Sequence, residues 1–244
     1  MKNNHVDVLI VGAGLSGIGM ACHLRRDCPN RSYVVLERRE AIGGTWDLFR
    51  YPGIRSDSDM FSFGYHFRPW TGDKVLADGP SIRRYVQETA EAYGVDRHIR
   101  FGRKVLDAAW SSDLGLWTVN VLNEATGKKE KYTAGFVVGC TGYYNYDAGY
   151  RPDFAGEQDF KGEIVHPQHW PEDYDYAGKN LWSRLRLRGK DTITGMRETR
   201  GWAPGRKLFF AMRANAPLAG HAFVNREADV TYKGFQGARR GRQD

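Results

Sequence analysis

Val8–Gly17, with the sequence VLIVGAGLSG, is the stretch that decides the fold of this chain. Its apolar first half predicts a buried strand, and its glycine-rich second half predicts a tight turn. A helical pattern then covers residues 18–26, and a second apolar run, Val34–Leu36, ends in the acidic Glu37. This order of strand, turn, helix and strand is typical of a unit that binds a dinucleotide.

Each glycine of the turn has a mechanical role in such a unit, and the pattern predicts a Rossmann-like fold. Gly12 permits the tight turn, Gly14 lets the backbone approach a pyrophosphate, and Gly17 lets the helix pack closely on the strand. Glu37 follows Gly17 by twenty residues, where a carboxylate can bind both ribose hydroxyls of an adenosine and disfavours a 2′-phosphate. The sequence therefore predicts a site for FAD or NAD rather than NADP. The alternative is a glycine-rich turn that binds nothing.

The basic residues of the chain are concentrated at one end. The 244 residues, enough for one large domain or two small ones, contain 36 Lys and Arg and 29 Asp and Glu, a net charge of +7. Residues 1–182 hold 22 basic and 24 acidic residues, whereas residues 183–244 hold 14 and 5. The basic excess therefore belongs to the tail, and we expect no nucleic-acid partner for the domain before it. A basic tail that acts as an interaction module stays open as an alternative.

The cysteines and the hydropathy pattern predict a cytoplasmic protein. Cys22, Cys28 and Cys140 are too few and too far apart for a disulfide framework, and an odd, sparse set is typical of a reducing compartment. The N-terminus lacks a signal-peptide pattern, and no apolar run approaches the ~20 residues that span a bilayer. A metal site is not expected at His166 and His169, because a proline separates them and no third ligand stands near.

The middle of the chain alternates between helix and strand signals. Gly79–Tyr93 has apolar residues at spacings of three and four, which predicts a helix that Gly94 ends. Residues 105–111 and 117–123 are expected to be strands joined by a short turn, and residues 136–140 a buried strand. We therefore expect an antiparallel insert between the opening β-α-β unit and a returning parallel strand, as in flavoproteins that bind two dinucleotides.

Two loops follow the predicted ribose-binding residue. Gly43–Asp47, with the sequence GGTWD, suits a loop whose backbone passes close to a flat ligand. Arg50–Asp59 is rich in turn residues and carries two arginines and two aspartates. An ordinary solvated loop is the alternative interpretation of this second segment.

A longer pattern, F-x-G-x-x-x-H-x-x-x-W-P, is met by Phe160, Gly162, His166, Trp170 and Pro171. It resembles the fingerprint of Baeyer–Villiger monooxygenases, a branch of the class B flavoprotein monooxygenases. Residues 43–47, 51–59 and 142–147 resemble the sub-branch that contains the mycobacterial monooxygenase that activates the prodrug ethionamide. The resemblance covers about residues 6–181.

The resemblance implies an FAD site at the start of the chain. The residues that it assigns to the pyrophosphate and the ribose are Gly12, Gly14, Ser16, Gly17 and Glu37. Those that it places along the flavin are Thr45, Trp46, Asp47 and Leu48, and the backbone of Val105 is expected at the adenine. The catalytic loop that it implies, where the flavin meets the nicotinamide of NADPH, contains Arg55, Ser56 and Asp57. His166 is expected to couple domain motion to the reaction cycle.

The activity that the resemblance implies is oxygenation of a small molecule by O₂, with FAD and NADPH as cofactors. One oxygen atom is inserted next to a ketone carbonyl or added to a sulfur compound. The expected α/β organisation is an FAD-binding domain over residues 1–159 without its C-terminal return and an interdomain linker over 160–181. A basic irregular tail over 182–244 is expected in place of the NADPH-binding domain, so the two-dinucleotide flavoprotein fold is incomplete.

The chain departs from the family after Leu181. Where the family has a strand and a second G-x-G-x-x-G motif for NADPH, this chain has Trp182–Gly189, WSRLRLRG, and no such motif follows. We therefore expect little monooxygenase activity and little NADPH binding. A shifted reading frame near residues 180–189 is one explanation, and a naturally divergent or shortened relative is the other. A non-catalytic flavin-binding fragment is the alternative to an enzyme.

Overall fold

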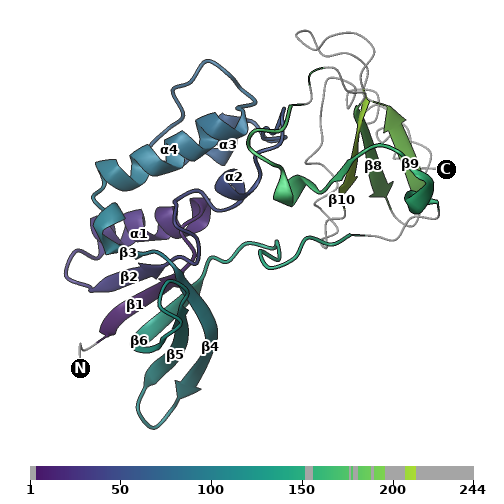
Figure 1. Cartoon of the computed structure of the whole chain (residues 1–244). Coiled ribbons are helices and arrows are strands. Elements are labelled where there is room, and N and C mark those ends of the chain that lie inside the picture. The colour runs from purple at the N-terminus through teal and green to yellow at the C-terminus, as the bar shows by residue number, and fades with distance from the viewer. Residues whose placement is uncertain are drawn as a thin grey trace, which may run out of the picture. The chain divides into compact units, whose positions relative to one another are not determined.

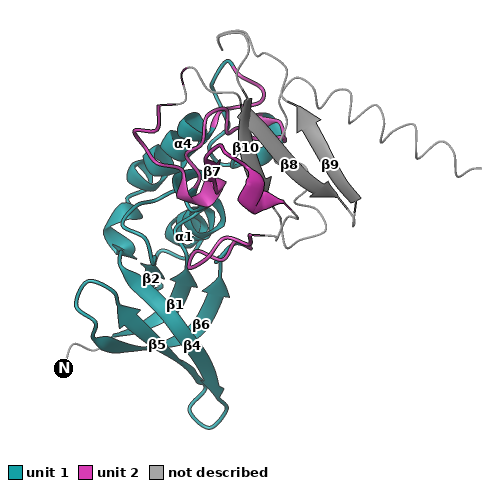
Figure 2. Cartoon of the chain, turned by 45° about the vertical axis from the view of Figure 1, so that its right-hand side comes forward, with its two compact units in different colours: residues 1–48, 61–73, 79–142 teal, residues 49–60, 74–78, 143–244 magenta. Residues whose placement is uncertain are grey.

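The computed structural model describes residues 4–151, 156–175 and 177, and the backbone of strands at 181–187, 190–195 and 207–212 (Figure 1). The chain divides into two compact units, drawn in different colours in Figure 2. Unit 1 comprises residues 1–48, 61–73 and 79–142, and unit 2 comprises residues 49–60, 74–78 and 143–244. Each unit contains one of the two sheets.

Unit 1 is built on a six-stranded sheet with the strand order β3-β2-β1-β6-β5-β4. Strand β1 (His5–Val11) lies between two parallel neighbours, β2 (Tyr33–Leu36) and β6 (Lys129–Gly139). The short β3 (Ile99–Arg100) extends the parallel part beyond β2. The Rossmann-like arrangement predicted from Val8–Gly17 is therefore confirmed.

An antiparallel ribbon completes this sheet. Strand β4 (Arg103–Ser111) pairs antiparallel with β5 (Leu116–Asn123), and β5 pairs antiparallel with the first half of β6. The second half of β6 pairs parallel with β1, so one long strand joins both parts of the sheet (Figure 1). The antiparallel insert is confirmed, but the strand expected at 136–140 begins earlier, because charged residues at 129–131 hide its start from a hydrophobic pattern. The expected burial is wrong as well, since Phe136 is 71% exposed and none of residues 137–140 is buried.

Two long helices accompany the parallel strands. Helix α1 (Leu15–Asp27) packs against β1 and β2, and α4 (Gly79–Ala92) packs against α1 (Figure 1). Both helices match the sequence prediction, with ends shifted by a few residues. Gly94, whose φ is +63°, follows α4 as a left-handed residue that glycine adopts readily. The shorter helical elements of this part of the chain are α2 (Thr45–Leu48), α3 (Met60–Phe63) and the 3₁₀ helix η1 (Asp96–His98).

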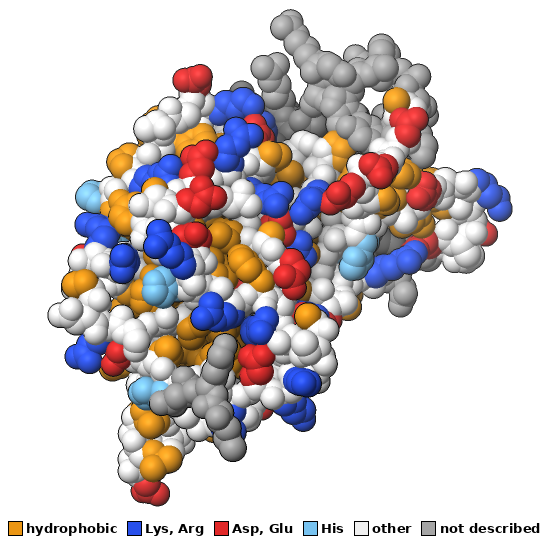
Figure 3. Space-filling model, turned by 60° about the vertical axis from the view of Figure 1, so that its left-hand side comes forward, with side chains coloured by type: hydrophobic (Ala, Val, Ile, Leu, Met, Phe, Trp, Pro, Cys, Tyr) orange, Lys and Arg blue, Asp and Glu red, His pale blue; other side chains and the backbone are white. Residues whose placement is uncertain are grey.

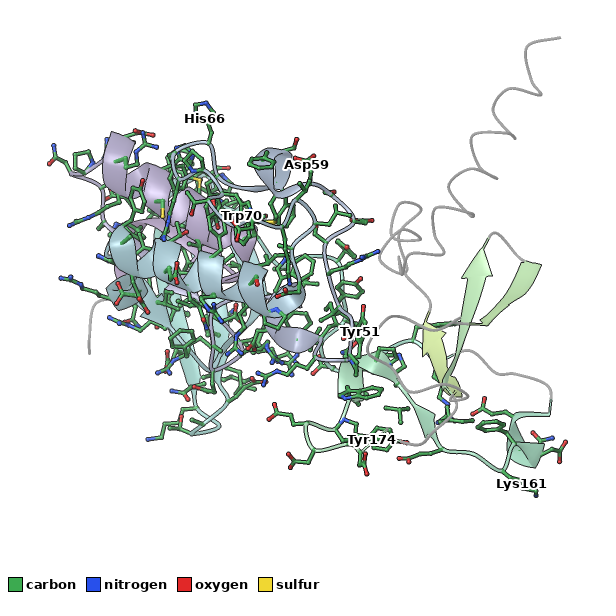
Figure 4. The ribbon with its side chains drawn as sticks, turned by 90° about the horizontal axis from the view of Figure 1, so that it is seen from above. Tyr51, Asp59, His66, Trp70, Lys161 and Tyr174 are labelled. Carbon is green, nitrogen blue, oxygen red and sulfur yellow. The ribbon has the colours of Figure 1, made fainter. Side chains whose placement is uncertain are left out.

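An aromatic cluster fastens the segment before α4 to both long helices. The hydroxyl of Tyr65 donates a hydrogen bond to the carbonyl oxygen of Leu15 in α1 (2.5 Å). The hydroxyl of Tyr85 in α4 donates to the carbonyl oxygen of Arg68 (2.5 Å) and accepts from the amide of Tyr65 (2.8 Å). Trp70, labelled in Figure 4, packs edge to face on Tyr85 with ring centroids 5.6 Å apart. This cluster fixes α1 and α4 relative to each other.

The core of unit 1 joins the parallel strands to the antiparallel ribbon. Its buried members are Leu9, Val34, Leu36, Val119, Val121, Tyr132 and Ala134. Burial of each large apolar side chain of this kind contributes about 1.5–3 kcal/mol. Leu9 and Ile10 are both fully buried although they point to opposite faces of β1. Burial on both faces explains why β1 is an unbroken apolar run.

Unit 2 has a four-stranded sheet with the order β7-β10-β8-β9. Its strands are β7 (Ile164–Val165), β8 (Leu181–Leu187), β9 (Lys190–Gly195) and β10 (Lys207–Met212), and its 3₁₀ helices are η2 (Glu157–Asp159) and η3 (Pro167–His169). The sequence predicts an irregular tail from residue 182, whereas β8, β9 and β10 are strands. Strand β10 pairs with β7 and β8, and a local pattern does not signal pairing with distant segments. The rest of the tail lies outside the described residues, and the proposed domain division stays a prediction.

Two surface properties bear on function. Among the described residues, no helix has the length and apolar character needed to cross a membrane. On the face of the molecule in Figure 3, basic and acidic side chains of the described residues are interspersed. This distribution agrees with the nearly balanced charge of residues 1–182.

Candidate dinucleotide site

The glycine turn between β1 and α1 is packed too tightly for side chains. Gly12 has a φ of +105°, and a Cβ atom there would lie 2.4 Å from the carbonyl oxygen of Cys140. A Cβ atom on Gly17 would lie 1.8 Å from the carbonyl oxygen of Gly12. The turn is therefore enclosed between the end of β6 and the first turn of α1, and glycine is required at both positions.

Helix α1 begins directly after this turn. Gly14 is its N-cap residue and has an extended backbone without a side-chain hydrogen bond. The first turn of α1 contains no acidic residue, and Ser16 within it is exposed. The first amide N–H groups of a helix have no partner within the helix, and the helix dipole favours an anion there. The start of α1 can therefore bind a phosphate group.

A second glycine loop lies against the first. The amide of Gly43 donates a hydrogen bond to the carbonyl oxygen of Ala13 (3.1 Å). A Cβ atom on Gly14 would lie 3.5 Å from the Cα atom of Gly44. Gly43 and Gly44 have φ values of +137° and +56°, which favour glycine. The glycine turn with the start of α1, residues 12–17, and the adjoining loop, residues 43–44, are together termed the glycine cradle.

The residues that the sequence places along the flavin follow the cradle in α2: Thr45, Trp46, Asp47 and Leu48. Thr45, Trp46 and Leu48 are half-buried, whereas Asp47 is buried. Trp46 packs edge to face on Phe63, with ring centroids 6.0 Å apart. Unit 1 therefore brings the residues predicted for the pyrophosphate and for the flavin together.

Glu37 ties the end of β2 to the glycine turn. Its Oε2 atom accepts a hydrogen bond from the amide of Ala13 (2.7 Å), and its Oε1 atom accepts one from the amide of Arg39 (2.8 Å). The residue is 4% exposed, and this burial raises the pKa of the carboxyl group, although the backbone hydrogen bonds oppose the shift. A carboxylate has about four lone-pair sites, so two further hydrogen bonds from ribose hydroxyls are possible.

Two arginines that the sequence analysis did not single out enclose Asp47. Its Oδ2 atom accepts hydrogen bonds from Nε and Nη2 of Arg39, at 3.0 and 2.6 Å. Its Oδ1 atom lies 3.0 Å from Nε of Arg83 in α4, an ion pair without an aligned hydrogen bond. Only 2% of the Asp47 side chain is exposed. Arg83 is far from Asp47 in the sequence, and no local pattern could have identified it.

Val105 reaches the same region through the start of β4. The amide of Glu37 donates to the carbonyl oxygen of Arg100 (3.0 Å), and the amide of Arg103 donates to the carbonyl oxygen of Glu37 (2.9 Å). Val105 pairs with Val121 and stands at a break in the β4–β5 register. The predicted adenine-binding residue thus lies two positions after a residue bonded to the predicted ribose ligand.

The predicted catalytic loop, residues 55–57, belongs to unit 2. Ser56 is 3% exposed, and its amide donates a hydrogen bond to the carbonyl oxygen of Ala77 (2.9 Å). Arg55 forms an isolated antiparallel bridge with Asp78. Asp57 follows as an exposed residue. These backbone contacts hold the loop and present the Asp57 carboxylate to solvent.

His166 supplies the one polar side chain among the five fingerprint residues, and its ring makes two hydrogen bonds. Its Nδ1 atom accepts a hydrogen bond from the amide of Gln168 (3.1 Å), so its proton lies on Nε2, which is 3.3 Å from the carbonyl oxygen of Tyr150. Burial lowers the pKa of His166 and favours this neutral form. A Cβ atom on Gly149 would lie 2.1 Å from the His166 ring. In the described part of the chain, no three His, Cys, Asp or Glu side chains are grouped as a metal site.

The other fingerprint residues also make contacts within unit 2. A Cβ atom on Gly162 would lie 2.5 Å from the ring of Phe160, which is 44% exposed. Trp170 is 9% exposed and packs edge to face on Tyr174, with ring centroids 5.3 Å apart. Tyr174 is labelled in Figure 4. Pro171 is exposed. The fingerprint thus folds its own segment around His166 and Trp170.

Comparison with known families divides the chain into two overlapping matches. The model described as "NAD(P)-binding Rossmann-like domain" matches residues 10–87. The model described as "Flavin-binding monooxygenase-like" matches residues 74–183. Both matches end before or just inside the basic tail.

Curated FAD-containing monooxygenases are similar to this chain at high sequence identity. The putative FAD-containing monooxygenase MymA of Mycobacterium tuberculosis is 62% identical over 179 residues, which are 73% of this chain and 36% of the relative. The FAD-containing monooxygenase EthA of Mycolicibacterium smegmatis is 59% identical over 177 residues, 72% of this chain and 36% of the relative. The chain therefore spans about a third of the length of these relatives.

Solved structures match a similar share of this chain. Cyclohexanone monooxygenase from Rhodococcus sp. Phi1, bound to NADP⁺, superimposes with a TM-score of 0.61 at 30% identity, over 75% of this chain and 34% of that chain. The complex of OTEMO with FAD and NADP gives a TM-score of 0.60 at 32% identity, over 75% of this chain and 35% of that chain.

Proposed function

The first three quarters of this chain correspond to the N-terminal part of the FAD-containing monooxygenases of the Baeyer–Villiger type, and from this premise we propose that the chain binds FAD in the glycine cradle. The carrying observation is the close backbone packing at the cradle's glycines, directly before the first turn of α1. A side chain on Gly12 or Gly17 would collide with backbone atoms of the turn. Such a close-packed turn before a helix fits a diphosphate.

Glu37 supports FAD over a 2′-phosphorylated nucleotide at this site. Its buried carboxylate is already fixed by two backbone amides, and it would accept the ribose hydroxyls of the FAD adenosine. A phosphate on the ribose would bring negative charge against this carboxylate. Thr45, Trp46 and Leu48 would then line the flavin, and the Val105 backbone would meet the adenine.

Within the family's reaction, FAD supplies the O₂ chemistry after reduction by NADPH. We propose small ketones or sulfur compounds as the substrate class of the lineage. The roles of this chain's residues would be to bind FAD in unit 1 and to present Asp57, with Arg55 and Ser56, to the nicotinamide. A cytoplasmic location accompanies this proposal, because Cys22, Cys28 and Cys140 are all free thiols.

A second candidate function is a flavin-binding chain without turnover. The observation that favours it is the sequence after Leu181, which has no second glycine fingerprint for NADPH. The basic residues 183–244 leave room for a third role, as an interaction module. We propose the monooxygenase lineage as the origin of the site and expect little oxygenation by this chain.

The test is an FAD titration of the purified full chain. Tight binding is expected to quench flavin fluorescence and to give a visible absorption spectrum with resolved shoulders. A colourless chain that takes up no added FAD would sink the proposal. If FAD binds, NADPH consumption with a simple ketone or thioether separates the two leading candidates: brisk consumption with product formation supports an enzyme, and none supports a flavin-binding fragment.

A further inference from the structure

We propose that Arg39, Asp47 and Arg83 form a positioning network that holds the glycine cradle in the shape that FAD requires. Asp47 acts through its two arginine partners and is not itself a ligand of FAD. This inference rests on the proposed FAD site and changes the role that the sequence assigned to Asp47.

The Asp47 carboxylate is already occupied by its partners. Oδ2 accepts two hydrogen bonds from the Arg39 guanidinium group, at 3.0 and 2.6 Å, and Oδ1 faces Arg83 at 3.0 Å. With 2% of its side chain exposed, Asp47 offers almost no surface to a ligand. Arg39 and Arg83 are more open, at 29% and 32%. The Asp47 carboxylate therefore binds two arginines within unit 1 and does not bind a ligand.

The network contacts both loops of the glycine cradle. A Cβ atom on Gly43 would lie 3.1 Å from Cβ of Asp47 and 3.2 Å from Cγ of Arg83, so Gly43 packs directly on the pair. The amide of Gly43 in turn donates to the carbonyl oxygen of Ala13 in the glycine turn. Arg39 reaches the ribose end, because its amide donates to Glu37 while its side chain binds Asp47. One buried carboxylate thus links α4, the second glycine loop and the end of β2.

The charges of the network explain why it should be sensitive to substitution. A buried carboxylate between two guanidinium groups is stable only with its partners in place, and removal of one leaves a buried charge poorly compensated. Because interiors are close-packed, relaxation of α2 would pass to Gly43 and Gly44. Around metal sites, substitution of groups that orient the ligands typically lowers affinity by about 10–100-fold, and the same reasoning applies to residues that hold a binding loop.

The alternatives are a purely structural ion pair and a direct contact between Asp47 and the flavin. A structural pair would lower the melting temperature without altering the affinity of the folded chain for FAD. A direct contact would make Asp47 important and both arginines dispensable. The positioning network predicts that all three residues affect FAD affinity and the environment of the bound flavin.

The experiment compares Asp47→Asn, Arg39→Gln and Arg83→Gln in the full chain. Arg84→Gln is the matched control, because Arg84 is the exposed neighbour of Arg83 on α4. The measurements are the Kd for FAD by fluorescence quenching, the visible circular dichroism of the bound flavin, and the melting temperature without FAD. We expect Kd to rise roughly 10–100-fold in the three network variants, with an altered dichroism spectrum, and to stay within about twofold in the control.

Three results would overturn the inference. The first is an unchanged Kd and spectrum in Asp47→Asn and Arg83→Gln, whatever happens to the melting temperature. The second is loss of affinity in Asp47→Asn alone, which assigns Asp47 to direct contact. The third is an equal loss in Arg84→Gln, which indicates a general charge effect.

Two further outcomes are also decisive. If Asp47→Asn does not fold, Arg83→Gln and Arg83→Lys settle the matter: the network predicts that the lysine, which keeps the charge, recovers part of the affinity lost in the glutamine variant, and equal affinities refute it. A wild-type chain that binds no FAD removes the proposed function itself, and the positioning role with it. Wild-type binding with unaffected variants removes only the network.

Discussion

The glycine cradle of unit 1 and the fingerprint segment of unit 2 are both marked by clear sequence motifs, yet their contacts differ in kind. The cradle gathers backbone groups from the β1–α1 turn, the loop before α2 and the end of β2, and it keeps Glu37 and Asp47 buried beside them. The hydrogen bonds of His166 and the ring contact of Trp170 lie between residues 150 and 174, although β7 within the segment pairs with the distant β10. The glycine motif assembles distant elements around a turn, whereas the side chains of His166 and Trp170 organise their own segment.

This difference predicts which property each motif affects, ligand binding or local stability. Where distant elements converge on glycines before a helix, the first amide groups of that helix have no partner within it, which is typical of a phosphate-binding site. Residues that satisfy one another locally are needed for the shape of their segment. Substitutions in the cradle should therefore change FAD affinity, and substitutions in the fingerprint should change the stability of unit 2.

The largest effect is expected from Gly17→Val. Its Cβ atom would lie 1.8 Å from the carbonyl oxygen of Gly12, so α1 or the turn must move. We expect loss of FAD binding and a stability loss of about 2–4 kcal/mol. The control is Gly115→Ala, at a φ of +60° with no neighbour within 4 Å, which should cost about 1 kcal/mol and leave FAD binding intact. Normal FAD affinity in Gly17→Val would contradict the claim that the glycine cradle binds FAD.

Glu37→Gln should produce the next largest effect. The amide side chain loses the charge and turns an NH₂ group toward one of the backbone amides that now donate to Glu37. We expect FAD affinity to fall roughly 10–100-fold, as for loss of hydrogen bonds to a charged group. Titration of Glu91→Gln, on the exposed side of α4, provides the matched control. Equal affinity for FAD in both variants would show that Glu37 is not a ribose ligand.

His166→Ala tests the fingerprint segment, where we expect a loss of local stability without a loss of FAD affinity. It removes the contacts of the imidazole with the Gln168 amide and the Tyr150 carbonyl, so residues 145–175 should lose about 1–2 kcal/mol of local stability. Hydrogen exchange of this segment would measure the change, with His66→Ala, at an exposed histidine of unit 1, as control. We expect FAD affinity to stay within about twofold in both. A tenfold loss of FAD affinity in His166→Ala alone would contradict the separation of roles.

The smallest effect is a pair of opposite pH dependences. The pKa of Glu37 is raised by burial, so its contribution to stability is complete below its unfolded pKa of about 4.5 and is lost as pH rises through the folded value. The pKa of His166 is lowered by burial, so its contribution is present above about 6.5 and is lost as pH falls through the folded value. Melting curves without FAD should show the first trend disappear in Glu37→Gln and the second in His166→Ala. Trends of the same sign would contradict these assignments.

Much of unit 1 could be predicted from the sequence because its signals are local. The run Val8–Val11 has to be buried on both faces, and the glycines after it form the turn that a close helix needs. The face of α4 is visible in the spacing of Ile82, Tyr85 and Val86. The start of β6 escaped prediction because its first three residues, 129–131, are all charged, and β8 to β10 escaped because their pairing is not local.

Some residues of the candidate site could likewise be predicted from the sequence, and others could not. Gly12, Gly14, Gly17 and Glu37 could be identified from spacing, because the βαβ geometry determines where each one stands. The partners of Asp47 could not be identified, because Arg83 meets its carboxylate only when α2 and α4 pack together, and Arg39 only when the loop after β2 folds against α2. A guanidinium group in a sequence carries no sign of which carboxylate it will bind.

By itself, the sequence determined that this chain has a dinucleotide-binding turn, an antiparallel insert between parallel strands and a likeness to a flavoprotein family, because glycine spacing and apolar runs are properties of the local chain. Only the tertiary structure decided that Glu37 is held by the amides of Ala13 and Arg39 and that Asp47 is enclosed by two arginines. These features depend on burial and on charges brought together from distant positions. Electrostatic interactions of this kind act over a few ångströms in space, whatever the separation along the chain.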